Sequence, residues 1–345
     1  MAFPSAAGHD TNIPSLESQR RRALKILLHG NLESDAYEIL LQEIQEGIKD
    51  SNFDELEIEI YLNFHEGQKL DSKKMNVLLL QEPKSVLPWQ YQSKVLSQFD
   101  VVIPFGPWRA HALGIAHWVF MPYRFPLQAE AQNVNREIWL SMINAGKFSS
   151  SVNSNYGLRR VVCKKLVKEE IDFRLFGWDW NTSYVTELRK RYIALRASFL
   201  AKEKISWRET FSTLFHHFKA YQGGIKTKSQ ILQNSELTLV IENESDYVTE
   251  KIFDAFNHQT VPIYVGPDLG TLLPEIEQCL LRCEPNAESI IQRIKQTSTE
   301  EILEKRAAIQ LLMRDDELKA IFDFGNVWRK VGKIVLKSLK ETYLK

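Results

Sequence analysis

The segment 237–266 restricts the fold of this chain more than any other part of the sequence. Residues 237–241 (Leu-Thr-Leu-Val-Ile) and 261–265 (Val-Pro-Ile-Tyr-Val) are short, largely apolar runs that predict buried strands. Between them, a polar turn at 242–249 precedes a helical pattern at 250–256. A strand, turn, helix and strand in this order predict parallel pairing, and ligands of open α/β sheets bind at the carboxyl ends of such strands. The polar turn is therefore a predicted binding site.

The charges at the end of this turn indicate what it binds. Thr249 is the expected N-cap, which places Glu250 and Lys251 in the first helical turn, where the helix dipole favours an acid and disfavours a cation. A lysine beside free backbone N–H groups suits a phosphate or diphosphate, whereas the alternative is a lysine that extends into solvent. Carboxylate, amide and hydroxyl groups at the same strand end suit sugar hydroxyls, and they belong to Glu242, Asn243, Tyr247 and Glu250.

The block 242–251, followed by Val261-Pro262 and Gly266, closely resembles the donor-binding signature of the α-1,3-fucosyltransferases, inverting enzymes that use GDP-fucose. Its core at 247–251, Tyr-Val-Thr-Glu-Lys, is far more specific than a short glycine pattern. The resemblance implies a GT-B-like α/β fold, in which two Rossmann-type domains face a cleft. It also implies donor binding by Asn243, Tyr247, Glu250 and Lys251, with Glu242 and Thr249 as further candidates.

Length and strand pattern agree with two domains. A chain of 345 residues with 44% hydrophobic content exceeds what one core usually holds. Predicted strands separated by helical stretches are typical of parallel sheets covered by helices on both faces. The expected strands of the first half lie at 24–28, 56–62, 75–80 and 100–104, and a helix at 160–168 and a strand at 173–177 follow. We expect residues 1–19 to be a disordered terminus and residues 20–155 to form the domain that binds the acceptor and carries the base. Residues 156–327 are expected to form the donor-binding domain, with a helical insert at 184–220, and residues 328–345 to form a basic amphipathic helix.

Glu82 is the candidate catalytic base. It follows the predicted buried strand 75–80 at its carboxyl end, and a carboxylate can accept the proton of an attacking hydroxyl. Residues 80–85, Leu-Gln-Glu-Pro-Lys-Ser, also resemble the segment that carries the family's proposed general base. The alternative is a solvated glutamate at a strand end, and Glu66 is the second candidate for the base.

An arginine is the second expected catalytic contribution. Residues 147–155 resemble a family pattern after which an arginine opens a helix and contacts the donor diphosphate, which implies Arg159 or, as the second candidate, Arg160. A helix-surface arginine is the plain alternative. Guanidinium is always charged and can neutralise a departing diphosphate without a metal. No convincing Asp-x-Asp pair occurs, so we expect no required cofactor or metal, while stimulation by divalent metal stays open.

Two further segments give less specific evidence about function. The turn-rich segment 106–126 contains aromatic and polar residues that either line an acceptor site or belong to ordinary packing, namely Trp108, His117, Tyr123 and Arg124. The insert 184–220 has aromatic residues at helical spacing and could be a lid, an oligomer contact or an acceptor wall. Its adjacent residues His216 and His217 point about 100° apart on a helix, so they are better explained as solvated or packed than as metal ligands.

Charge and targeting signals bear on partners and location. Lys+Arg and Asp+Glu both number 44, so no global charge attracts the chain to nucleic acid. The sequence has no apolar run of eighteen residues and no signal-peptide pattern, which predicts a cytoplasmic protein of the bacterial type. Three cysteines are expected to be reduced and mostly buried. The helix 328–345 either lies on the anionic inner membrane or packs back across the first domain.

Together these features predict transfer of L-fucose from GDP-β-L-fucose, with inversion and with Glu82 as base. The expected acceptor is a hydroxyl, such as O3 of N-acetylglucosamine or glucose, of a glycan or lipid-linked oligosaccharide. Arg159 and Lys251 would stabilise the charge that grows on the diphosphate. One alternative is a transferase of the same fold that uses another nucleotide sugar, and the other is a non-catalytic carbohydrate-binding relative.

Overall fold

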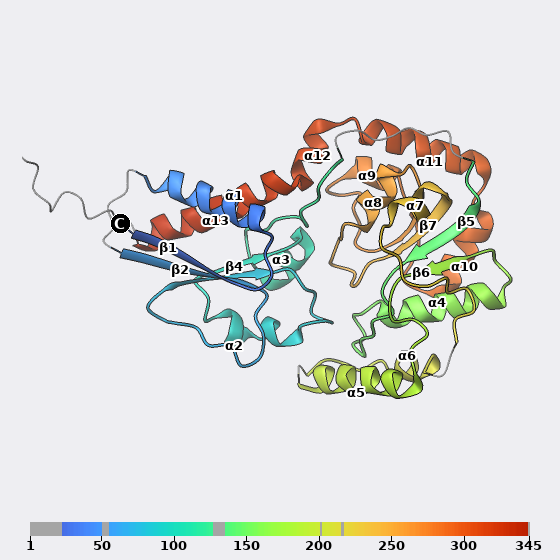
Figure 1. Cartoon of the computed structure of the whole chain (residues 1–345), viewed down its shortest axis with the longest axis horizontal. Helices are drawn as coiled ribbons and strands as arrows, with labels where there is room; N and C mark the ends of the chain where they lie inside the picture. Colours follow the sequence, from blue (N-terminus) through green and yellow to red (C-terminus); the bar gives the residue numbers. More distant parts are fainter. Residues whose placement is uncertain (1–22, 50–54, 127–134, 201, 215–216, 344–345) are drawn as a thin grey trace, which may run out of the picture.

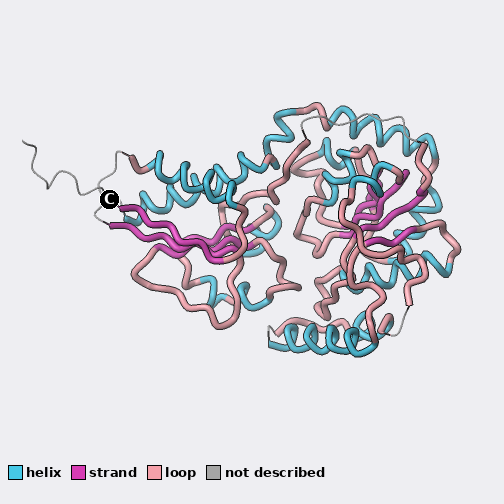
Figure 2. The backbone as a smooth tube through the Cα atoms, in the orientation of Figure 1, coloured by secondary structure: helices cyan, strands magenta, loops and turns pink. Residues whose placement is uncertain are grey.

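The computed structural model describes residues 23–49, 55–126, 135–200, 202–214 and 217–343, which form two α/β units side by side (Figure 1). Each unit contains one sheet, and all strand pairings within both sheets are parallel (Figure 2). The first sheet has the order β1-β2-β3-β4, with strands Ala23–His29, Glu55–Leu62, Met75–Leu80 and Val101–Pro104. The second has the order β6-β5-β7-β8-β9, with β5 Ile138–Ile143, β6 Arg174–Phe176, β7 Ser235–Ile241, β8 Val261–Val265 and β9 Leu281–Arg282. The predicted α/β class is confirmed, and the expected disordered segment 1–19 lies outside the described residues.

The first sheet is covered on both faces. β3 is buried along its whole length, as its apolar sequence predicts. The alternation in β2 predicts a half-exposed strand, but Glu59, between Ile58 and Ile60, is also buried. Its carboxylate is 2.7 Å from the Lys74 ammonium group, which lets a charged side chain occupy a covered face.

Helices α1 (Ser34–Gly47) and α13 (Phe324–Tyr343) pack against each other over one face of this sheet (Figure 1). A Cβ at Gly332 of α13 would lie 2.8 Å from the Glu43 side chain of α1, so this close contact requires glycine. The apolar side chains of α13 are buried in the first core, namely Val327, Trp328, Val331, Val335 and Leu339. Of the two alternatives that the sequence left open for 328–345, the structure shows the second: the C-terminal helix packs its apolar side across the first unit.

The elements near the other face are short. They are the 3-10 helix η2 (Pro88–Tyr91), α2 (Ser93–Leu96) and α3 (Pro107–Leu113). Trp89, Val95 and Leu113 pack in a small core with Leu78 and Leu80 of β3. This core holds the chain directly after β3, where Glu82 lies.

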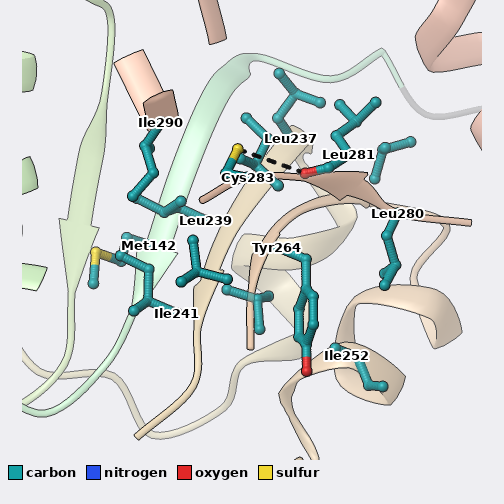
Figure 3. Close-up of a cluster of buried hydrophobic side chains, with 14 of the residues drawn as sticks. Met142, Leu237, Leu239, Ile241, Ile252, Tyr264, Leu280, Leu281, Cys283 and Ile290 are labelled. Atoms are coloured by element: carbon teal, nitrogen blue, oxygen red, sulfur yellow. Dashed lines mark hydrogen bonds between the residues drawn. The ribbon is translucent and has the colours of Figure 1, made fainter. Parts of the chain in front are cut away.

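The second unit has its own core around β7 and β8. Leu239 and Ile241 of β7 pack with Met142 of β5 and with side chains from the surrounding helices (Figure 3). Cys283 donates a long hydrogen bond from its thiol to the Leu281 carbonyl at 3.8 Å. The helices of this unit are α4 (Tyr156–Lys168), α7 (Ser229–Gln233), α8 (Lys251–Asn257), α9 (Pro274–Gln278), α10 (Ala287–Gln296), α11 (Thr299–Leu312) and α12 (Asp316–Phe322). The three cysteines are all free and buried, as predicted.

Two boundaries differ from the expected ones. β5 pairs with β6 and β7, so the second unit begins before residue 155, and the expected boundary at 155/156 is wrong. The helix expected from 328 begins at Phe324. Helices are found in the insert 184–220, which is expected to be helical, but they are two rather than one long segment in its described part, namely α5 (Tyr184–Leu200) and α6 (Trp207–Ser212). Within the described ranges, no helix combines the length and apolar character needed to cross a membrane.

Candidate functional site

A cavity of about 480 Å³ lies between the two units. The first unit contributes Gln81 and Glu82, which directly follow β3, together with Met121. The second unit contributes the ends of β5 and β7, the start of α8, and part of α4. Six of the candidate donor-binding residues line this one cavity: Arg159, Asn243, Tyr247, Thr249, Glu250 and Lys251. The fold thus brings them to the same place as the candidate base.

Glu82 is held by its main chain. Its backbone N–H donates to Asn63 Oδ1 at 2.8 Å, and its carbonyl oxygen accepts from the Tyr91 hydroxyl at 2.7 Å. Its carboxylate lines the cavity and has no hydrogen bond or ion pair among the residues that the structure describes. The other candidate, Glu66, lies on an exposed loop outside this cavity. The geometry therefore gives Glu82 a fixed backbone and an available carboxylate.

Arg159 extends from α4 to the end of β7 and is 2% exposed. Its Nε donates to the Ile241 carbonyl at 3.0 Å, and its Nη2 donates to Asn243 Oδ1 at 2.8 Å. Burial lowers the pKa of Arg159, but a guanidinium titrates so high that it stays charged at neutral pH. The side chain thus supplies a positive charge to the cavity wall and fixes Asn243.

Arg160 points elsewhere. Its Nη2 donates to the Gly146 carbonyl at 2.6 Å, and its Nη1 is 3.3 Å from the Glu187 carboxylate. It does not line the cavity. Both arginines were candidates for the diphosphate contact. The structure places Arg159 at the cavity, whereas Arg160 pairs with Glu187 and so links α4 to α5.

The turn between β7 and α8 differs from the expected cap. α8 begins at Lys251 and Glu250 is its N-cap, so the prediction of Thr249 as N-cap is wrong. Glu242 is fully buried and accepts hydrogen bonds from the Thr249 backbone N–H at 2.9 Å and its hydroxyl at 2.7 Å, while the Thr249 hydroxyl accepts from the Lys251 backbone N–H at 3.5 Å. This burial raises the pKa of Glu242. Because α8 has seven residues, positive charge at this edge comes from side chains more than from a helix dipole.

The cavity wall is positive. Five cationic side chains line it, Lys147, Arg159, Lys226, Lys228 and Lys251, against the carboxylates Glu82 and Glu250. Lys251 donates to the Thr249 hydroxyl at 2.8 Å, and Lys228 lies 3.0 Å from Glu250. Burial opposes ionisation of Glu250, but Lys251 and Lys228 outweigh it and lower the pKa of Glu250 to about 2. An excess of cations in a partly closed site favours a ligand with a diphosphate.

Tyr247 and its neighbours join the two units. The Tyr247 ring is buried in the first core and lies 4.6 Å from the Arg109 guanidinium of α3. Arg109 is also 3.5 Å from Asp246 and 3.9 Å from Glu244. The Ser85 backbone N–H donates to the Glu244 carboxylate, which ties the turn to the chain that carries Glu82. Arg109 and Glu244 were not predicted, although two carboxylates within a turn that leads to Tyr247 signal a nearby cation.

The candidate acceptor residues lie outside the cavity. His117 contacts a backbone carbonyl of β4 at 2.9 Å, and the Tyr123 hydroxyl donates to Asp254 at 3.1 Å. Arg124 pairs with two carboxylates near the start of α1 at 2.6 and 2.5 Å, and Trp108 packs against the second core. These contacts favour the packing alternative for all four residues.

The structure places one of the two adjacent histidines of the insert. His217 is exposed, and His216 lies outside the described residues. In the ranges that the structure covers, no group of three His, Cys, Asp or Glu side chains is placed to hold a metal ion.

The fold is shared with proteins of known structure. The Anabaena protein HepE, solved in complex with UDP and glucose, is 8% identical and aligns with a TM-score of 0.51 over 91% of this chain and 99% of that chain. An α,α-trehalose 6-phosphate synthase from Burkholderia multivorans is 12% identical, with a TM-score of 0.49 over 90% of this chain and 78% of that chain. A glycosyltransferase from Rickettsia africae is 12% identical, with a TM-score of 0.46 over 93% and 100%.

The sequence itself matches no protein-family model and no curated protein. The likeness to HepE extends over nearly the whole of both chains, and it agrees with two parallel α/β units that face each other. The predicted GT-B architecture is therefore confirmed.

Proposed function

We propose that this protein is a glycosyltransferase that moves a sugar from a nucleotide diphosphate to a hydroxyl group of a glycan. The observation that carries this proposal is the shared cavity, in which the Glu82 carboxylate from one unit meets Arg159 and Lys251 from the other. The fold supports it, because HepE has the same architecture and was solved with a nucleotide and a sugar.

The proposed donor is GDP-β-L-fucose. Its support is the resemblance of the block 242–251 to the donor signature of the α-1,3-fucosyltransferases. Asn243, Tyr247 and Glu250 of this block line the cavity, where they would hold the sugar, ribose and phosphate groups. A uridine nucleotide sugar is the rival donor, because HepE was solved with UDP and glucose.

The proposed reaction is a direct displacement. Glu82 takes the proton of the acceptor hydroxyl while that oxygen forms a bond to the anomeric carbon of the sugar. The bond from this carbon to the diphosphate oxygen breaks, and its electron pair leaves with the nucleotide. Arg159 and Lys251 stabilise the negative charge of the leaving diphosphate, so that no metal is required. Attack opposite the leaving group converts a β-linked donor into an α-linked product.

A donor panel tests this proposal. The purified protein is incubated with GDP-fucose, GDP-mannose or UDP-glucose and a glycan array, with and without a metal chelator. We expect transfer from GDP-fucose, insensitive to the chelator. Transfer from UDP-glucose alone would show that the donor is not GDP-fucose. Loss of transfer in the presence of the chelator would show that the reaction requires a metal. Nucleotide binding without any transfer would favour the non-catalytic alternative.

A further inference from the structure

Helix α5 has its polar and apolar sides reversed relative to an ordinary surface helix. Its buried side chains are Glu187, Arg191, Ala194 and Ser198. Glu187 pairs with Arg160 of α4 at 3.3 Å, and the Ser198 hydroxyl lies 2.8 Å from that of Ser150. A helix that packs on a core normally turns its apolar side inward. A polar network holds α5 instead, and its apolar side chains are left outside.

The outward side chains are large. Along α5, Val185, Leu188, Tyr192 and Phe199 are 73%, 40%, 68% and 76% exposed. Their spacing of three, four and seven residues places them on one side of the helix. On the neighbouring helix α6, Trp207 and Phe211 are 59% and 52% exposed, and their parallel rings lie 6.2 Å apart. We call these six residues the α5–α6 face. Single exposed apolar residues are ordinary, but a group of this size indicates a contact surface.

The charge around the α5–α6 face selects the kind of partner. Arg189, Arg196 and Lys202 are exposed, and the first two follow the apolar stripe around the helix. Glu187 is the only acidic residue between 184 and 202, and it is buried in the network with Arg160. Over the whole stretch 184–212, which includes α6, the chain has seven Lys or Arg residues against three acidic residues, of which Glu187 pairs with Arg160 and Glu203 with Lys84. Apolar and aromatic side chains bordered by an excess of cations suit the boundary between the headgroups and acyl chains of an anionic membrane.

The location of the face is compatible with a flat partner. α5 runs along one edge of the molecule, on the far side of the second unit from α11 (Figure 1). We propose that the α5–α6 face docks this protein on an anionic lipid surface. The apolar side of α13 does not take this role, because it is buried in the first core.

The proposed docking has a consequence for the substrate, and this step rests on the proposed function. Ile193, Arg196 and Leu200 of α5 form one wall of a second cavity, of about 1030 Å³, and residues 84–94 form part of the opposite wall. Those residues directly follow Glu82. A glycan acceptor attached to a lipid could therefore enter from the membrane and extend toward the candidate base.

Vesicle sedimentation tests the docking independently of any activity. The full chain is mixed with vesicles of phosphatidylcholine alone or with one third phosphatidylglycerol. We expect binding to the anionic vesicles, reduced at least about tenfold by Val185→Ser with Phe199→Ser, because each substitution removes an exposed side chain that would be buried in lipid. The double variant Leu303→Ser with Leu311→Ser on α11, at positions 56% and 69% exposed, is the matched control and should bind like the wild type.

Three results would overturn the proposal. The first is that the wild type does not bind anionic vesicles, and the second is that the α5 and α11 double variants bind equally well. The third is a dimer in sedimentation velocity that the α5 substitutions dissociate, because it would show that the face binds a second copy of the chain. Thermal melting of each variant identifies unfolding as a separate cause. Because vesicle binding does not require transfer, an inactive protein that still docks would contradict only the proposed function.

Discussion

Glu82 combines a rigid main chain with an uncommitted carboxylate. Asn63 accepts from its backbone N–H and Tyr91 donates to its carbonyl oxygen, and no described residue neutralises its side chain. A general base needs both properties, because the carboxylate must stay near the acceptor hydroxyl and be free to take its proton.

Replacing this carboxylate with an amide tests its role. We expect Glu82→Gln to lower kcat by about 10²–10⁴-fold, the usual contribution of a general base, with little change in nucleotide binding. The matched control is Glu38→Gln, which changes an exposed carboxylate on α1 outside both cavities and should leave kcat as it is. Steady-state rates and the dissociation constant for GDP separate the two effects. An active Glu82→Gln enzyme would exclude this residue as the base.

Arg159 and Arg160 differ in role although they are adjacent. Arg159→Lys removes the donors to Ile241 and Asn243, so we expect GDP to bind at least about tenfold more weakly, a loss of about 1.4 kcal/mol. Arg160→Lys should reduce stability through Glu187 while GDP binding of the folded protein is preserved. Calorimetry and thermal melting together measure both outcomes. The opposite assignment of the two effects would contradict the geometry.

The sequence identifies the residue types at this site better than their roles. Adjacent helical side chains point about 100° apart, so sequence alone leaves Arg159 and Arg160 open until the position of the Ile241 carbonyl is known. Thr249 is a reasonable cap by type, and its hydroxyl accepts from the Lys251 N–H at 3.5 Å, but the helix begins one residue later than predicted, with Glu250 as its N-cap. The backbone path of a polar turn determines which residue caps the helix and which arginine reaches the site, and periodic sequence patterns do not describe that path.

The turn from β7 into α8 is held together by opposite charges. Lys228 contacts Glu250 at 3.0 Å and Asp254 at 2.5 Å, so it links the cap of α8 to its first turn. The pKa of Glu250 is lowered to about 2, from an ordinary value of 4.5. Its ionised form therefore stabilises the fold above about pH 4.5, and this stabilisation is lost as the pH falls through about 2.

Removing Lys228 tests this linkage. Lys228→Gln should lower the free energy of unfolding at pH 7 by less than about 1 kcal/mol, because the Glu250 side chain is 39% exposed and solvent screens the pair. The difference from the wild type should shrink as the pH falls from about 4.5 toward 2, since Glu250 then becomes protonated in both proteins. Urea unfolding across this pH range measures it. A difference that grows in acid would contradict the assignment.

The strands and helices were predictable where their patterns are periodic. β3, β7 and β8 coincide with apolar runs, and α1 follows its apolar spacing. No strand is predicted from the sequence at 138–143, and this segment falls within the expected first domain, because its partner β7 lies almost a hundred residues later, as Ser141 pairs with Thr238. For α5 the sequence predicts a helix but not its orientation, which depends on the distant contacts of Glu187 and of Arg191 with Phe148.

The whole molecule is joined by buried and exposed polar contacts across the cavity. Arg109 is 1% exposed and faces Asp246 and Glu244, while Lys84 is 46% exposed and lies 2.5 Å from Glu203. The buried contact holds the donor turn against α3, and the hydrogen bond from Ser85 to Glu244 holds the same turn against the chain after β3. Its position suggests that it fixes the distance between Glu82 and the donor side of the cavity.

We expect the Arg109 and Lys84 contacts to differ in their contribution to the free energy of unfolding. Arg109→Met should destabilise the protein by about 1–3 kcal/mol and enlarge its radius of gyration, because it leaves two carboxylates together without their cation. Lys84→Met leaves one carboxylate, that of Glu203, without its cation where Arg109→Met leaves two, so it should destabilise the protein less and leave the radius unchanged. Small-angle scattering and thermal melting report both. Equal effects of the two substitutions would show that burial does not distinguish them.

Nucleotide binding to the cavity between the units can be measured directly by calorimetry. Titration of GDP into the wild-type protein should release heat with saturation, GDP-fucose should compete, and Lys251→Met should weaken binding at least about tenfold because it removes a cation from the cavity wall. The same titration with UDP should give weaker binding. Absence of heat and of competition at saturating GDP would contradict a guanine nucleotide sugar site in this cavity.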